Sequence, residues 1–475
     1  MSRHLRRRAV VLVATAALAL GACSGSSGGS SAGGGSSGSS GGGADASVCP
    51  VGALAKATGP VTITFWHGLN QANEKVLQGL VDKFNTSQTK VKVNLVNQTG
   101  YEEILRKWVA GLGTGDLPDV AQLEDTATQQ MIDTQSIVPA GACAKADHYD
   151  TSDIVGRVLE RYTVNGTLYP MPFNVSNPVL YYDKNAFTAA GLDPEKPPTT
   201  LDEVKADSQK IKNAGYQTGF GLKLNPWYLE QWAAKADSFY VNNENGRTKR
   251  ATAAVFDDAA GKESFTWMKN MVDSGLARTN PDDGPNAFDN LLGIRSKVNG
   301  MTIDTSAALG QISTVLQSGE GGGVKLGVGP MPGPEGTGGV LVGGGALYIS
   351  KKSSPEKIAA TWEFLKFLVS ASTQAEFAAG TGYVPISKSA TKQPVLVAQW
   401  QKEPGYKVAY DQMLSGKDDT KTAGPIIGDY AGVRETVRDA ETKMLTQGTP
   451  PDAALKQAQT DATAKIQDYN TRVGA

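Results

Sequence analysis

The sequence predicts an α/β protein built from two lobes. Its 475 residues exceed the length at which one hydrophobic core stops growing, so two lobes of about 150 to 200 residues are expected. Strand and helix patterns alternate over residues 61–123, which is typical of a parallel α/β sheet. Residues 171–182 form a Pro-bracketed extended stretch with polar side chains at its middle. We interpret this stretch as a hinge strand between the lobes, although alone it also fits a surface turn.

The N-terminus has the pattern of a lipoprotein signal peptide. A basic segment is followed by an apolar run, residues 9–20, which is too short to span a bilayer comfortably. Leu20-Gly21-Ala22-Cys23 then resembles a lipobox. We expect a signal peptide over residues 1–22, lipidation of Cys23 and a flexible Gly/Ser tether over residues 23–59. A plain secreted protein cleaved nearby is the alternative.

The remaining cysteines, Cys49 and Cys143, are expected to form a disulfide, because a leftover pair in an extracytoplasmic chain more often does so than binds a metal. Two separate buried thiols are the alternative. The three histidines show no metal-ligand spacing, so neither a metal nor a cofactor is expected.

The folded part is predicted to begin with strands at residues 61–66, 90–96 and 119–123, separated by helices at 71–85 and 101–112. Ligands of such sheets bind at the carboxyl ends of the strands. This rule places the following residues on one rim: Trp66, His67, Tyr101, Glu124 and Asp125.

After the hinge, helices are predicted at residues 184–190, 201–214, 228–237, 258–274, 305–316, 354–369, 433–446 and 451–470, and strands at 298–304, 325–329 and 340–350. We expect residues 60–173 and 305–350 in the first lobe, and residues 174–304 and 351–475 in the second. Hinge segments are expected near residues 174–178, 298–304 and 346–350.

The order of several motifs is similar to that of the family 1 extracellular solute-binding proteins of ABC importers. The motifs are the lipobox, the Gly/Ser tether and residues 62–67, 118–123, 172–184, 190–200, 343–349, 362–368 and 381–386. The chain looks most like the subgroup that binds glycerol-3-phosphate and glycerophosphodiesters. The resemblance implies a periplasmic-binding-protein-like fold, with the ligand in the cleft between the lobes.

The resemblance also implies a set of ligand contacts. Tyr101 and Asp125 match groups that contact glycerol hydroxyls, and Arg434 matches an arginine that pairs with phosphate. Ser176 and Ser306 (with Thr305 as the fallback) match serines that contact the phosphate, Gly344 matches a backbone donor and Tyr383 a phenol donor. A buried phosphate needs charge-assisted donors, which agrees with this set. As alternatives, Asp125 is a helix cap, residues 343–345 a bare turn, Tyr383 a core aromatic and Arg434 a surface arginine.

One position departs from the subgroup. Leu201 stands where enterobacterial-type relatives carry tryptophan, so we expect a wider pocket that accepts a head group on the phosphate. Trp227, Tyr228 and Trp232 are candidates for contact with a choline-like cation, and each also fits a helix core. We therefore hypothesise that glycerophosphodiesters such as glycerophosphocholine bind at least as well as glycerol-3-phosphate.

The expected function is ligand capture by lobe closure and delivery to a permease, by a lipid-anchored monomer on the outer face of the membrane. The net charge of −1 argues against a nucleic-acid partner. A sugar-binding receptor on the same scaffold is the closest alternative. A hydrolase is disfavoured because no nucleophile with a base, and no paired carboxylates, are visible. A purely structural lipoprotein fits least.

Overall fold

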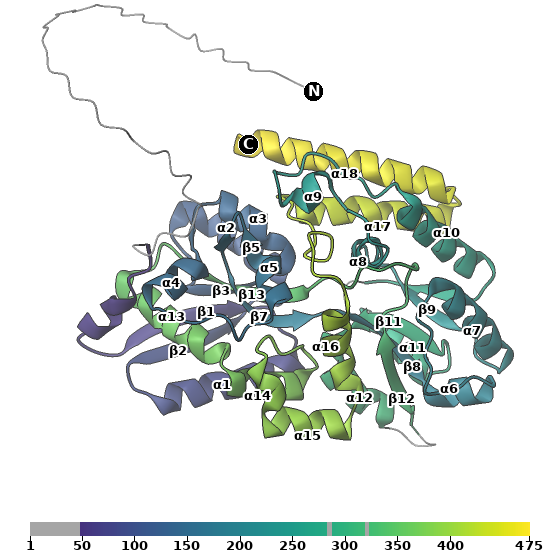
Figure 1. Ribbon diagram of the computed structural model, residues 1–475, viewed down its shortest axis with the longest axis horizontal. Coiled ribbons are helices and arrows are strands. Elements are labelled where there is room, and N and C mark those ends of the chain that lie inside the picture. The colour runs from purple at the N-terminus through teal and green to yellow at the C-terminus, as the bar shows by residue number, and fades with distance from the viewer. Residues whose placement is uncertain (1–47, 283–286, 319–322) are drawn as a thin grey trace, which may run out of the picture. The chain divides into compact units, whose positions relative to one another are not determined.

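The computed structural model describes residues 48–282, 287–318 and 323–475 of the chain. The predicted signal peptide and the lipidation site Cys23 lie outside these residues. Within them, no helix is long and apolar enough to cross a lipid bilayer. The chain forms two sheets with helices packed around both, so the predicted α/β fold with two lobes is confirmed (Figure 1).

The sheet of the first lobe has six strands, in the order β2-β1-β3-β13-β4, with β7 also paired to β13. β1 is parallel to β2 and β3, whereas β13 is antiparallel to its neighbours. The strands are β1 (Val61–His67), β2 (Val91–Asn97), β3 (Val120–Glu124), β4 (Ile137–Val138), β7 (Met171–Ser176) and β13 (Gly343–Ser350). A separate hairpin consists of β5 (Thr163–Val164) and β6 (Thr167–Leu168).

The helices of the first lobe come from three separate parts of the chain. They are α1 (Gln71–Ser87), α2 (Tyr101–Thr114), α3 (Thr128–Asp133), α4 (Ala140–Ala146), α5 (Gly156–Tyr162), α12 (Leu309–Gln317), α13 (Pro355–Leu368), α14 (Ala371–Thr381) and α15 (Pro394–Lys402). The next helix, α16 (Gly405–Ser415), packs mainly on two strands of the second sheet. Asn70 caps α1 by accepting from the backbone N–H of Asn73, and Ser354 caps α13 by accepting from that of Lys357.

The sheet of the second lobe has five strands, in the order β10-β9-β11-β8-β12. They are β8 (Pro178–Asp183), β9 (Phe220–Lys223), β10 (Ala277–Asn280), β11 (Met301–Thr305) and β12 (Leu326–Pro330). The helices around it are α6 (Lys184–Ala189), α7 (Leu201–Asn213), α8 (Trp227–Lys235), α9 (Asn242–Gly246), α10 (Ala259–Asp273), α11 (Asp289–Arg295), α17 (Tyr430–Gln447) and α18 (Pro451–Val473). Thr200 and Glu203 form a capping box at the start of α7.

The chain crosses between the sheets at Asn177, where β7 of the first sheet ends and β8 of the second begins. The other expected hinge segments are corrected. Residues 298–304 lie within the second lobe, and the crossing follows at Thr305–Ser306. Residues 346–350 lie wholly in the first sheet, because the crossing precedes β13 at residues 331–342. A further connection runs between α16 and α17, over residues 416–429.

The expected boundaries of the lobes also need correction. Residues 351–475 were assigned to the second lobe, but α13 packs on β1 and β13, and α14 packs on α1. Within the expected first-lobe return, β12 pairs with β8 of the second sheet. The later helices do belong with the second lobe: α16 packs on β12 and β8 of the second sheet, and α17 and α18 lie side by side and contact α10 (Figure 1). The amphipathic pattern of a helix does not indicate which sheet the helix covers, so these segments were predicted in the wrong lobe.

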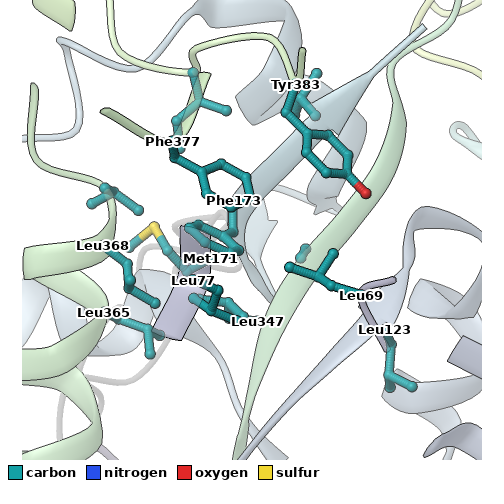
Figure 2. Close-up of a cluster of buried hydrophobic side chains, with 14 of the residues drawn as sticks. Leu69, Leu77, Leu123, Met171, Phe173, Leu347, Leu365, Leu368, Phe377 and Tyr383 are labelled. Carbon is teal, nitrogen blue, oxygen red and sulfur yellow. The ribbon is translucent and has the colours of Figure 1, made fainter. Parts of the chain in front are cut away.

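Two hydrophobic clusters form the cores of the lobes. Figure 2 shows part of the first, where Met171, Leu347 and Leu365 lie close to Phe173. The ring of Phe377 stacks on that of Phe173 at 4.8 Å and on that of Tyr383 at 5.4 Å. The hydroxyl of Tyr383 points away from this apolar cluster (Figure 2). The core therefore holds the ring of Tyr383 and leaves its polar end for another role.

The folded part begins earlier than expected. The predicted tether reaches residue 59, but Cys49 is buried and residues 51–56 form a 3₁₀ helix that packs against α13. Cys49 forms a disulfide with Cys143 on α4, across 94 residues of sequence. The bond fastens the start of the folded chain to the first lobe.

We expect the double substitution Cys49→Ser/Cys143→Ser to lower the free energy of unfolding by about 2 to 4 kcal/mol, because the open chain regains the entropy of a long loop. Chemical denaturation of the variant and the unsubstituted protein, both without reductant, measures this difference. Equal denaturation midpoints would contradict a stabilising bond at this position.

Candidate functional site

Two adjoining cavities lie between the lobes. The first, of about 240 Å³, is called here the tyrosine cavity, and its lining includes Asp125, Ser176, Lys223, Asp304, Gly344 and Tyr383. The second, of about 470 Å³, is called the arginine cavity, and its lining includes Glu102, Arg434 and Arg438. The wall shared by both consists of Tyr101, Glu124, Asn225, Trp227 and Asp282. The two cavities together form one interlobe cleft.

The first lobe contributes two phenols to the tyrosine cavity. Tyr101 begins α2, and its hydroxyl accepts a hydrogen bond of 2.7 Å from the side-chain amide of Asn174. The amide oxygen of Asn174 in turn accepts from Gln122 at 2.8 Å. Burial raises the pKa of Tyr101 and of Tyr383, so both phenols stay neutral and can donate to a ligand.

Backbone geometry requires glycine at Gly344. Its φ of 97° is one that only glycine adopts easily, and a Cβ there would lie 2.1 Å from the carbonyl oxygen of Asn174. This close approach brings β13 against the end of β7, next to Ser176. The backbone of β13 is thereby exposed to the cavity where a side chain would otherwise stand.

Asp125 follows β3 and is almost fully buried. Its Oδ2 accepts a hydrogen bond from Nη2 of Arg161 on α5. Burial raises the pKa of Asp125, and the charge of Arg161 opposes that rise. Arg161 also donates to the carbonyls of Ala423 and Pro425, in the connection between α16 and α17. The carboxylate is therefore paired, and its partner is tied to a segment that joins the lobes.

Arg434 on α17 is held between two carboxylates from different lobes. Its Nε and Nη2 donate to both oxygens of Glu230 on α8, at 2.7 and 2.9 Å. Its Nη1 donates to Glu124 at the end of β3, at 2.8 Å. Burial lowers the pKa of Arg434, but the charges of Glu230 and Glu124 raise it by more, so the guanidinium stays charged. The fork geometry fixes its orientation in the cleft.

Lys223 repeats this arrangement in the tyrosine cavity. It ends β9, and its Nζ lies 2.9 Å from Asp282 and 3.1 Å from Asp304. Burial lowers the pKa of Lys223, and the charges of the two aspartates raise it by more. Each of these cleft cations is thus flanked by two carboxylates, and each group of three carries a net charge of −1.

Two further predicted site residues lie at or beside the cavities. Trp227 begins α8 and lies in the wall shared by both cavities. Ser306 is buried beside the tyrosine cavity, between Thr305 and Ala307, and its hydroxyl has no hydrogen-bond partner within the described residues.

Ser306 itself is not among the lining residues, and neither are four other predicted residues: Trp66, His67, Leu201 and Trp232. Leu201 begins α7 in the core of the second lobe and faces a surface groove between α7 and α10, so its expected effect on the ligand pocket is wrong. His67 is fully buried, and burial lowers its pKa. Trp66 packs against the core of the first lobe.

Tyr228 lines the tyrosine cavity, whereas Trp232 is buried and donates to the carbonyl of Pro332.

Sequence reasoning missed Lys223, Asn225, Glu230, Asp282 and Asp304 as cleft residues. Strand β9 is only four residues long and was not predicted, so the residues at its carboxyl end had no assigned place. For Asp304 a signal existed, because a strand ending there was predicted and the rule on carboxyl ends applies to it. Within the described residues, no cluster of three His, Cys, Asp or Glu side chains is suited to hold a metal ion.

Comparison with known proteins identifies the family. Residues 79–408 match the family model of the bacterial extracellular solute-binding proteins. This chain belongs to that family. It is accordingly a solute-binding protein of an ABC importer and not an enzyme.

Named relatives of this solute-binding protein include the sn-glycerol-3-phosphate-binding periplasmic proteins UgpB of Yersinia pestis and Pectobacterium atrosepticum. Each is 28% identical to it, and the matches cover 84% and 87% of this chain and 91% and 93% of the relatives.

Solved structures share the fold of this solute-binding protein. UgpB from Mycobacterium tuberculosis, in complex with glycerophosphocholine, has 20% identity and a TM-score of 0.70, and the match covers 88% of this chain and 100% of that one. The GacH receptor of Streptomyces glaucescens, solved unliganded and with acarbose, has 21% identity and a TM-score of 0.72, over 86% and 99% of the two chains. At these identities the likeness concerns the fold.

A buried carboxyl of this solute-binding protein lies on the same helix as Arg434. Glu441 on α17 is almost fully buried, and its Oε2 has no hydrogen-bond partner within the described residues. Burial raises the pKa of Glu441 to about 8, and the charge of Arg438 opposes that rise. The folded state therefore holds this proton more tightly than the unfolded state. As pH rises from the pKa of Glu441 in the unfolded chain to about 8, its ionisation lowers the free energy of unfolding.

We expect Glu441→Gln to be more stable than the unsubstituted protein at pH 8, with a difference that shrinks as pH falls toward 5. The amide keeps the hydrogen-bonding shape of the neutral acid and never ionises. Thermal denaturation of both proteins between pH 5 and 9 measures the difference, and Glu435→Gln on the exposed face of α17 is the matched control. A difference independent of pH would contradict the raised pKa.

Proposed function

We propose that this protein captures glycerol-3-phosphate or glycerophosphodiesters, such as glycerophosphocholine, and delivers them to the permease of an ABC importer. We further propose that Cys23 anchors it by lipid to the outer face of the membrane, and that it acts as a monomer. The names of the relatives support the ligand class. The observation that carries the proposal is the oriented guanidinium of Arg434 in the cleft.

Arg434 retains donors for an anion. A guanidinium has five N–H donors, and the hydrogen bonds to Glu230 and Glu124 use three of them. The remaining two, one on each terminal nitrogen, suit a phosphate that accepts both. The carboxylates hold the guanidinium in place before the ligand arrives, so little conformational entropy is lost on binding.

The tyrosine cavity suits the polyol part of such a ligand. Asp125 and Glu124 can accept hydrogen bonds from hydroxyl groups, and the phenols of Tyr101 and Tyr383 can donate or accept. Trp227 offers an aromatic face in the wall between the two cavities, which suits a choline-like cation. These groups supply contacts for both ends of a glycerophosphodiester.

Contacts on both lobes support a closure mechanism. Tyr101, Asp125 and Tyr383 belong to the first lobe, whereas Trp227 and Arg434 belong to the second. A ligand favours the closed arrangement only if it binds that arrangement better than the open one, and a ligand that touches both walls meets this condition. The permease would then distinguish the closed, loaded protein.

The charges of the cleft favour a phosphodiester over a phosphomonoester. Lys223 and Arg434 are each outnumbered by carboxylates, so the cleft repels a dianion more than it repels a single negative charge. Glycerophosphocholine carries one negative and one positive charge, and it avoids this penalty. This charge argument replaces the one from Leu201, which lies away from the cleft.

A sugar is the second candidate, because carboxylates and aromatic walls also suit neutral polyols and structures of the same fold include complexes with acarbose and maltose. A neutral sugar has no need for a guanidinium with free donors. The sugar hypothesis therefore predicts that binding tolerates a change at Arg434.

We expect glycerophosphocholine to bind more tightly than glycerol-3-phosphate, and maltose not to bind, in isothermal titration calorimetry of the purified protein. We expect Arg434→Lys to weaken binding of both esters about tenfold or more, because an ammonium cannot replace the planar fork. The matched control is Arg106→Lys, since Arg106 makes a similar fork with Glu103 on the exposed surface of α2.

Thermal denaturation of each variant shows whether weaker binding comes from unfolding of the protein or from loss of the side-chain contact with the ligand. Binding of maltose without binding of either ester would overturn the proposed function in favour of the sugar candidate. If Arg434→Lys left the binding of both esters unchanged, this result would contradict the role of Arg434 on which the proposed function rests.

A further inference from the structure

A buried arginine of the first lobe joins the cleft to the connection between α16 and α17. Nη2 of Arg161, on α5, donates to Asp125, which lines the tyrosine cavity. Its Nη1 donates to the carbonyl oxygens of Ala423 and Pro425, at 3.2 and 3.0 Å. Both carbonyls belong to the connection over residues 416–429. One guanidinium therefore holds a carboxylate of the cavity and the backbone of the connection at the same time.

The second lobe holds the same stretch of backbone with another arginine. Arg247, in the chain between α9 and α10, donates to the carbonyl oxygen of Gly424 at 2.7 Å and to that of Ala423 at 2.6 Å. It also donates to the carbonyls of Glu160 and Arg161 on α5, at 3.0 and 3.3 Å. Three successive carbonyls of the connection are thus held by arginines from both lobes.

Gly424 brings the connection into close contact with Arg161. Its φ of 79° lies in the left-handed region that favours glycine, and a Cβ there would lie 2.7 Å from Nη1 of Arg161. The backbone therefore fits closely around the guanidinium, and a side chain at this position would displace it.

A neighbouring arginine makes only part of these contacts. Arg157, one turn earlier on α5, donates to the carbonyl of Met413 at 2.6 Å and to the hydroxyl of Thr422 at 3.4 Å. Its nearest carboxylate is that of Asp418, at 3.9 Å, which lines neither cavity. Arg157 therefore holds the connection without reaching the cleft, whereas Arg161 reaches both.

We propose that Arg161 is a positioning residue that ties Asp125 in the tyrosine cavity to the connection over residues 416–429. The connection leads directly into α17 of the second lobe, so a ligand that binds Asp125 acts on that lobe through one side chain of the first. This inference rests on the proposed function, because it takes Asp125 as a ligand contact. The hydrogen bonds that carry it belong to the protein alone.

The ionisation of Asp125 gives this tie a measurable signature. Burial raises the pKa of Asp125 to about 6, and the charge of Arg161 opposes that rise. The other charged or titratable groups around the carboxyl are Glu124, Tyr162, Tyr348 and Arg434. As pH falls through about 6, Asp125 takes up a proton and loses acceptor capacity for ligand hydroxyls, so binding is expected to weaken. Without Arg161, the same loss is expected to begin at a higher pH.

The first test is a double-mutant cycle on glycerophosphocholine binding, measured by calorimetry at neutral pH. We expect Gly424→Ala to weaken binding about three- to tenfold, because its methyl group displaces the guanidinium of Arg161. In the Arg161→Gln background, which itself binds more weakly, the same substitution is expected to have no further effect. The matched control is Gly448→Ala, which also has a positive φ but has no atom within 4 Å of the new methyl group. If Arg161→Gln does not fold, Arg161→Lys takes its place, because an ammonium lacks the planar fork.

The second test titrates Asp125 in the ligand-free protein by carboxyl ¹³C NMR. We expect Arg161→Gln to raise the pKa of Asp125, because a charge that lowers it is lost. Arg157→Gln, which removes a buried arginine from the same helix, is expected to leave this pKa unchanged. Gly424→Ala is expected to shift the pKa of Asp125, and Gly448→Ala is not.

The two tests separate this inference from the proposed function. If Gly424→Ala weakens binding equally with and without Arg161, the tie is overturned and the proposed function stands. If glycerophosphocholine does not bind but Gly424→Ala shifts the pKa of Asp125, the proposed function fails and the tie stands. An unchanged pKa of Asp125 in Gly424→Ala overturns the tie in either case.

Discussion

The contact of Arg434 with Glu230 and Glu124 is the interaction on which the geometry of the cleft depends. It joins α17 and α8 of the second lobe to the end of β3 in the first. Glu230 lies one helical turn after Trp227, so the same contact sets where the indole stands. Without the guanidinium, the two carboxylates would be left unpaired, and such a buried unpaired charge is costly at low dielectric. The protein therefore maintains the cleft as a charged network in which each member holds its neighbours.

Pairing with carboxylates weakens the attraction of the cleft cations for an anion, but it also fixes the positions of their donors. Because Lys223 and Arg434 each lie between two carboxylates, neither offers its full charge to a ligand. What they offer is direction: donors held in place by buried partners, facing cavities of limited size. Such a site discriminates by the positions of donors and acceptors in a ligand more than by its overall charge. This behaviour suits a transport receptor that has to bind and then release its ligand unchanged.

The sequence predicted the strands of the first sheet better than those of the second. Regular alternation around β1, β2 and β3 reveals a parallel sheet, and the rule on carboxyl ends placed Tyr101 and Asp125 at its rim. In the second lobe, β9 is short and its pattern is weak, so Lys223 had no predicted neighbours. The pairing of Arg434 with Glu230 and Glu124 joins residues 204 and 310 positions apart, which no local pattern encodes. Amphipathic helices such as α13 and α14 show a buried face in sequence, but not which sheet they bury it on.

The disulfide between Cys49 and Cys143 has a mechanical consequence. The chain enters the folded part next to Cys49, and the covalent link to α4 makes that entry point part of the first lobe. Any tension on the chain before this residue is therefore borne by the first lobe and bypasses the second. Under the proposed closure, the second lobe would move about the connecting segments without carrying this load, so tension at the anchor would not oppose ligand binding.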